Sequence, residues 1–79
     1  MQTIVGWHIE MEFEEVDRKT RAAALLRLPD GTELRARGHA TRHENDPEQL
    51  RVGEETAAAR ALNALASELL MKAGTDLKE

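Results

Sequence analysis

The chain has no cysteine and no tyrosine, and its aromatic residues are one tryptophan and one phenylalanine. The absence of cysteine excludes disulfides and thiolate metal sites, and a reducing compartment is compatible with such a chain. No apolar run approaches the ~20 residues that cross a bilayer, and the first residues lack the basic and apolar regions of a signal peptide. We therefore expect a cytoplasmic protein that does not insert into a membrane.

What is present fits one small globular domain. The 79 residues are 41% hydrophobic and 33% charged, and we expect a single domain over 1–79 with an ordered core from about 5 to 73. A core this small is often completed by oligomerisation. The net charge of -4 argues against a general affinity for nucleic acid, because neutralising phosphates needs clustered lysine and arginine.

Residues 5–14 alternate between apolar and polar side chains, which predicts a half-buried strand. The apolar side chains are Trp7, Ile9, Met11 and Phe13, and the polar ones are His8, Glu10, Glu12 and Glu14. After a polar turn at 15–19, a weaker alternation over 20–28 predicts a second strand. Its inward positions would be Thr20, Ala22, Ala24, Leu26 and Leu28.

The tripeptide at 29–31 predicts a tight turn, because Pro29 presets φ and Gly31 can adopt the left-handed conformation. A third strand is predicted over 32–41. Its inward residues at 36, 38 and 40 are small, so another element can pack closely against it.

A polar connector over 42–51 precedes a predicted helix from about 53 to 73, with Gly74 ending it. Ala58, Ala61, Leu62 and Leu69 lie on the same face as Leu65. Glu54 and Glu55 would occupy the first turn, where acidic residues offset the helix dipole and repel phosphate.

The predicted order of elements is three strands followed by a helix. The simplest packing is an α+β domain in which a three-stranded antiparallel meander carries one C-terminal helix on one face. We expect a core formed by Trp7, Ile9, Met11, Phe13, Leu34, Leu62, Leu65 and Leu69.

Few residues suit catalysis or metal binding. His39, His43 and Glu44 have ligand chemistry, but they span a strand end and a loop, so solvent-facing side chains are the favoured interpretation. Ser67 is the sole serine and falls in the middle of the helix. Acid–base catalysis needs a cleft that raises the pKa of one carboxyl, whereas the predicted glutamates line an open sheet. We expect no enzyme activity, no cofactor and no metal.

The outward side of the sheet is the candidate interaction face, with acidic residues on the first strand and basic residues on the third. Such a surface is complementary to itself after a two-fold rotation, whereas scattered surface charge is the alternative interpretation. We predict a homodimer of micromolar affinity, in which two such faces meet or strand edges pair beside them. The residues are Glu10, Glu12, Glu14, Arg21, Leu25, Arg27, Arg35, Arg37 and His39.

The stretch "RKTRAAALLRLPDGTELRARGHATR", followed after a linker by "VGEETAAARALNALASELL", resembles a family of small domains of unknown function from GC-rich Gram-positive bacteria. The resemblance covers roughly 5–73. It implies three antiparallel strands and a helix, similar to a double-stranded-RNA-binding domain that lacks its first helix, and it extends to parts of ribosome-hibernation factors.

Two functions follow as hypotheses. The first is a non-catalytic interaction module that forms a homodimer through the sheet, and the alternative is an RNA- or ribosome-binding protein. Exposed aromatic residues for base stacking are not expected, because Trp7 and Phe13 fall on the inward register. The RNA-binding relatives begin their second helix with lysines, where this chain has Glu54, Glu55 and the alanines of 57–59. The interaction module is therefore the favoured hypothesis.

Overall fold

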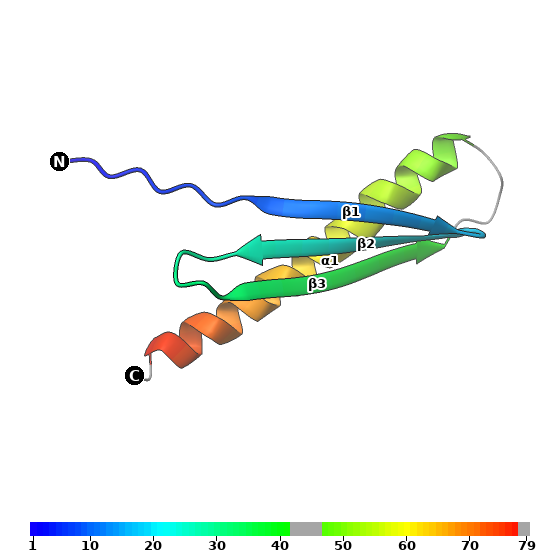
Figure 1. Cartoon of the computed structure of the whole chain (residues 1–79). Helices are drawn as coiled ribbons and strands as arrows, with labels where there is room; N and C mark the ends of the chain where they lie inside the picture. Colours follow the sequence, from blue (N-terminus) through cyan, green and yellow to red (C-terminus); the bar gives the residue numbers. More distant parts are fainter. Residues whose placement is uncertain (42–46, 78–79) are drawn as a thin grey trace.

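A computed structural model of the chain describes residues 1–41 and 47–77. It confirms the α+β fold, in which an antiparallel sheet of order β1-β2-β3 carries one helix on one face (Figure 1). The elements are β1 (Ile9–Val16), β2 (Lys19–Arg27), β3 (Glu33–Thr41) and α1 (Pro47–Leu77).

β1 begins later than the alternation predicts. Its first residue, Ile9, is opposite Leu26, and β2 ends one residue further on, at Arg27. Residues 1–7 therefore lie beyond the end of β2, although their pattern continues that of a strand. At the other end, β1 reaches Val16 and a two-residue turn leads into β2. Asp17 in this turn has φ 57°, a conformation that aspartate tolerates better than most residues.

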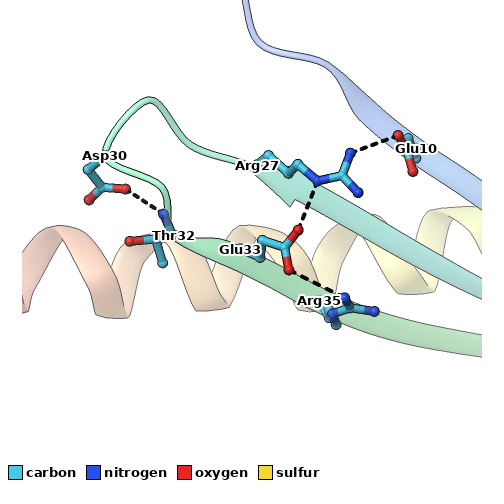
Figure 2. Close-up of polar contacts among 6 residues, drawn as sticks. All are labelled: Glu10, Arg27, Asp30, Thr32, Glu33 and Arg35. Atoms are coloured by element: carbon cyan, nitrogen blue, oxygen red, sulfur yellow. Dashed lines mark hydrogen bonds and ion pairs between the residues drawn. The ribbon is translucent and has the colours of Figure 1, made fainter.

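The β2–β3 connection forms the tight turn that the sequence predicts. Gly31 has φ 89°, and its N–H donates to the carbonyl of Leu28 at 3.0 Å. Leu28 in turn donates to the carbonyl of Thr32 at 2.8 Å. The carboxylate of Asp30 accepts the N–H of Thr32 at 2.9 Å (Figure 2), so the turn is closed by both backbone and side-chain hydrogen bonds.

The helix is longer than predicted at both ends. It begins at Pro47, a residue suited to the first helical turn because its ring presets φ and it has no N–H to leave unpaired. Glu54 and Glu55 consequently lie about two turns inside α1, and the prediction that they offset the dipole in its first turn is wrong. Gly74 lies within the last turn of α1 instead of ending it.

The core lies between α1 and the two strands β2 and β3, against which the helix packs. Small residues dominate it: Ala22, Ala24, Leu26, Ala36, Ala40, Ala57, Ala61 and Leu65. The hydroxyl of Thr20, which is buried with them, donates to Glu15 at 2.8 Å. The predicted inward positions of the second and third strands are therefore confirmed in register.

The predicted core of large residues is only partly correct. Leu65 is 2% exposed, and Met11, Leu34 and Leu69 are partly buried against the core. The other four predictions are wrong, with exposed fractions of 53% for Trp7, 47% for Ile9, 44% for Phe13 and 42% for Leu62. A helix about 10 Å across covers about two strands spaced ~4.8 Å apart, so packing on β2 and β3 leaves β1 outside the covered region.

Gly38 explains why the helix crosses β3 so closely. A Cβ atom at this position would overlap the backbone of Ala57 and Ala61 and lie 2.8 Å from the carbonyl carbon of Arg60. The guanidinium of Arg60 donates to the carbonyl of His39 at 2.7 Å, which ties the same helical turn to β3. The prediction that small residues on the third strand admit a close neighbour is confirmed, and that neighbour is α1.

Candidate interaction surfaces

The outer face is the side of the sheet that points away from α1, and it carries the predicted interaction residues. The acidic and basic side chains assigned to it are all exposed. Leu25 is half-buried instead of fully exposed, because it has neighbours on both sides in the central strand. The outer face consists of Glu10, Glu12, Glu14, Arg21, Ala23, Leu25, Arg27, Glu33, Arg35, Arg37 and His39.

The strand register aligns these residues in rows across the sheet. The middle row runs from Glu12 through Ala23 to Arg37. The rows beside it run from Glu10 through Leu25 to Arg35, and from Glu14 through Arg21 to His39. Because β2 is central, the acidic residues of β1 and the basic residues of β3 form opposite borders of the face.

Several of these charges are already paired within the chain. The guanidinium of Arg27 contacts Glu33 at 2.8 Å and Glu10 at 3.1 Å, and Arg35 contacts the other oxygen of Glu33 at 3.4 Å (Figure 2). The hydrogen bond from Arg27, followed by that from Arg35, lowers the pKa of Glu33. The hydrogen bond to Glu33 raises the pKa of Arg27, and the charge of Glu10 adds to this. All these groups are exposed, so each pair adds little to stability.

The middle row differs from its neighbours. Among the described residues, no ion pair engages Glu12 or Arg37, and the small side chain of Ala23 lies between them. An open depression of about 590 Å³ lies here, lined among others by Glu12, Ala23 and Arg37. Its acidic side chains, Glu12 and Glu14, are exposed to solvent.

A second surface follows from the position of the helix. The β1 edge surface consists of Val5, Trp7, Ile9 and Phe13, with exposed fractions of 70%, 53%, 47% and 44%. Sequence reasoning missed this surface because it assigned the apolar residues of the first strand to the core. The sequence did contain a signal for this surface: it predicts one helix and three strands, and one helix does not cover three strands.

Among the described residues, those considered for metal binding or nucleophilic chemistry are not brought together. His39 lies on the exposed outer face, whereas His43 and Glu44 are outside the described residues. Over 1–41 and 47–77, no three metal-ligating side chains cluster. The hydroxyl of Ser67 donates to the carbonyl of Asn63 one turn earlier at 3.4 Å.

Over residues 1–41 and 47–77, no helix is long and apolar enough to cross a bilayer.

The comparison with known families concerns nearly the whole chain. Residues 5–79 match the sequence profile described as Rv2632c-like. The chain belongs to the Rv2632c-like family. Its fold is also similar to the crystal structure of Rv2632c, with a TM-score of 0.86 and 31% sequence identity, over 98% of this chain and 90% of that one. No curated protein matches the sequence. The family and fold expected from the sequence are therefore confirmed.

Proposed function

We propose that this Rv2632c-like protein is a non-catalytic interaction module that forms a homodimer through its sheet. The observation that carries this proposal is the β1 edge surface. Trp7, Ile9 and Phe13 are each more than two-fifths exposed, in a domain whose buried core is built mainly of alanine. Contiguous apolar residues exposed on a small protein mark an interface with another molecule.

The strand that carries this surface also supports a protein partner. β1 is at the edge of the sheet, with β2 as its neighbour, so its outer backbone groups can bond to a further strand. Proteins commonly cover, charge or bend such edges because an uncovered edge pairs readily with another chain. Here the edge is eight residues long.

The outer face offers a second way for two sheets to meet. A two-fold axis along β2 would place Glu12 of each copy over Arg37 of the other, because the two residues are at the same level of the sheet. This face-to-face dimer stays a prediction. In both possible dimers, face-to-face and edge-to-edge, the two copies associate through the sheet.

Analytical ultracentrifugation of the full chain tests the proposal. Sedimentation velocity from low to high micromolar protein should show a reversible change from monomer to dimer. A species that stays monomeric at high micromolar concentration, at both low and high salt, would contradict the proposal. Mixing two affinity-tagged forms should also yield a mixed dimer, which separates self-association from aggregation.

A further inference from the structure

The segment before β1 is extended and continues away from the sheet in line with that strand (Figure 1). Ile4 and Val5 are largely exposed, and Trp7 is about half exposed. Because β2 ends at Arg27, this segment projects past the strand that would pair with it. It therefore has the conformation and the apolar pattern of a strand, but no strand beside it in the sheet.

The acidic residues of β1 restrict how a second copy can pair with this edge. In an antiparallel pair, residues directly opposite each other lie on the same face, and like charges there are destabilising. If Glu12 faced its own symmetry mate, Glu10 would face Glu14 of the second copy. Moving the two-fold axis back to Glu10 would place Glu10 opposite Glu10 of the second copy. Self-pairing centred within the acidic row is therefore unfavourable.

Moving the two-fold axis one more residue toward the N-terminus, to Ile9, removes every contact between glutamates of the outer face. Glu10 then faces His8, Glu12 faces Gly6 and Glu14 faces Ile4, each from the second copy. The register centred on His8 pairs as many residues and also separates the glutamates, but it places His8 opposite its own copy, whereas the Ile9 register places each His8 opposite a glutamate. Registers centred nearer the start of the chain than His8 pair fewer residues. The charge pattern and the length of the edge therefore favour one register.

We propose that two copies join antiparallel along this edge, with Ile9 opposite Ile9, to form a continuous six-stranded sheet. This inference rests on the proposed homodimer and specifies its interface. Residues 3–15 of each copy would form the two central strands. The extended segment of one copy thereby becomes the partner of β1 in the other.

The helix-facing side of this register brings apolar residues together. Trp7 faces Met11 of the second copy, and Val5 faces Phe13 of the second copy. Cross-strand pairs of aromatic and aliphatic residues stabilise sheets. On the outer face, His8 lies opposite Glu10 of the second copy, and this contact occurs twice because of the symmetry.

Contacts within one chain favour the edge register over a dimer in which the two outer faces stack. Glu10 already contacts Arg27, and Glu14 lies 3.7 Å from Arg21. Leu25, the apolar residue at the centre of that face, is half-buried. Stacking would therefore gain few new ion pairs and cover little apolar surface, whereas the edge register covers side chains that the helix does not.

Substitutions at His8 test the register with little risk to the fold, because this side chain is exposed. His8→Glu would face Glu10 of the second copy at both contacts and should weaken the dimer about tenfold. His8→Lys should keep or strengthen it, and His8→Glu combined with Glu10→Lys should restore it. Leu25→Glu is the matched control on the outer face and should leave the dimer unchanged. Circular dichroism checks the fold of each variant.

The single tryptophan provides a second measurement. Trp7 fluorescence should shift to shorter wavelength as the protein concentration passes through the dimer transition, and it should not do so in His8→Glu. A dimer that His8→Glu leaves unchanged but Leu25→Glu dissociates would overturn this register while supporting the proposed homodimer. A chain that stays monomeric would overturn both. A dimer that neither substitution weakens would overturn the edge register alone.

Discussion

Gly38 in β3 and Ala61 in α1 lie so close together that a Cβ atom on the glycine would overlap the backbone nitrogen of the alanine. This contact fixes the path of the helix over β3, since any side chain at this point would push the two elements apart. The helix consequently covers β2 and β3, and the apolar side of β1 remains exposed. The candidate interface is thus a consequence of one close approach in the core.

Replacing this glycine should destabilise the domain. Gly38→Ala forces its Cβ into helical backbone, which cannot move aside as the end of a flexible side chain can. We expect a loss of about 1–3 kcal/mol in the free energy of unfolding, as for other overpacked cores, measured by urea denaturation. Gly74→Ala is the control, because nothing lies within 4 Å of a Cβ there. In a helix this change should stabilise by about 0.5–1 kcal/mol. Equal effects of the two substitutions would contradict the packing described.

Leu65 and Leu62 should differ in their contribution to stability, although both were expected in the core. Leu65 is 2% exposed, whereas Leu62 is 42% exposed. Leu65→Ala should cost roughly 2–5 kcal/mol, as for other buried leucines, and Leu62→Ala less than about 1 kcal/mol. Urea titrations at a protein concentration where the chain is monomeric check this difference. A cost for Leu62→Ala as large as that for Leu65→Ala would show that α1 is rotated from the position described.

Asp30 should make the stability of the domain depend on pH. The ammonium of Lys72 contacts its carboxylate at 2.8 Å. This hydrogen bond, followed by that from Thr32, holds the pKa of Asp30 well below its usual range. A lowered folded-state pKa favours folding above the unfolded value of about 4, and this contribution is lost as the pH falls below it. Asp30→Asn should therefore reduce the thermal midpoint most near pH 7, and the difference from the wild type should shrink in acid.

The same experiment in a Lys72→Met background shows whether the contact with Lys72 is what makes Asp30 stabilising. Without the ammonium, the effect of Asp30→Asn on the thermal midpoint should be smaller near neutral pH, because the contact with Thr32 alone remains. An effect of unchanged size would attribute the stabilisation to the turn instead of to the helix contact. Lys72 also contacts Asp76 at 2.9 Å, so the single substitution Lys72→Met is measured alongside.

Bare structured RNA should not bind with micromolar affinity. The net charge is -4, and Arg27 and Arg35 of the outer face already contact carboxylates. Fluorescence anisotropy with a labelled duplex RNA at low salt measures this directly. Micromolar binding that weakens steeply with salt, and is lost when Arg35 and Arg37 are both changed to glutamate, would favour the RNA-binding alternative.

The order of elements, the turn at Gly31 and the faces of the strands follow from the sequence without any knowledge of the packing. Alternation over 20–26 and 34–40 requires only local geometry, because side chains one residue apart point to opposite sides of a strand. The outer-face residues could therefore be placed on one surface from their spacing, and the family resemblance gave the same fold.

Which apolar side chains are buried depends instead on tertiary packing. Trp7, Ile9, Met11 and Phe13 have the alternating pattern of an inward face. The three of them within β1 do lie on the side of the sheet that carries α1, because Ile9, Met11 and Phe13 pair with the buried residues Leu26, Ala24 and Ala22. Whether the helix lies over them depends on Gly38, in another strand, and on how closely it lets two backbones approach. The start of β1 likewise depends on strand pairing, because β2 ends at Arg27 and offers no partner to the residues before His8. Periodicity reports which side of an element a residue lies on, whereas burial depends on what packs against that side.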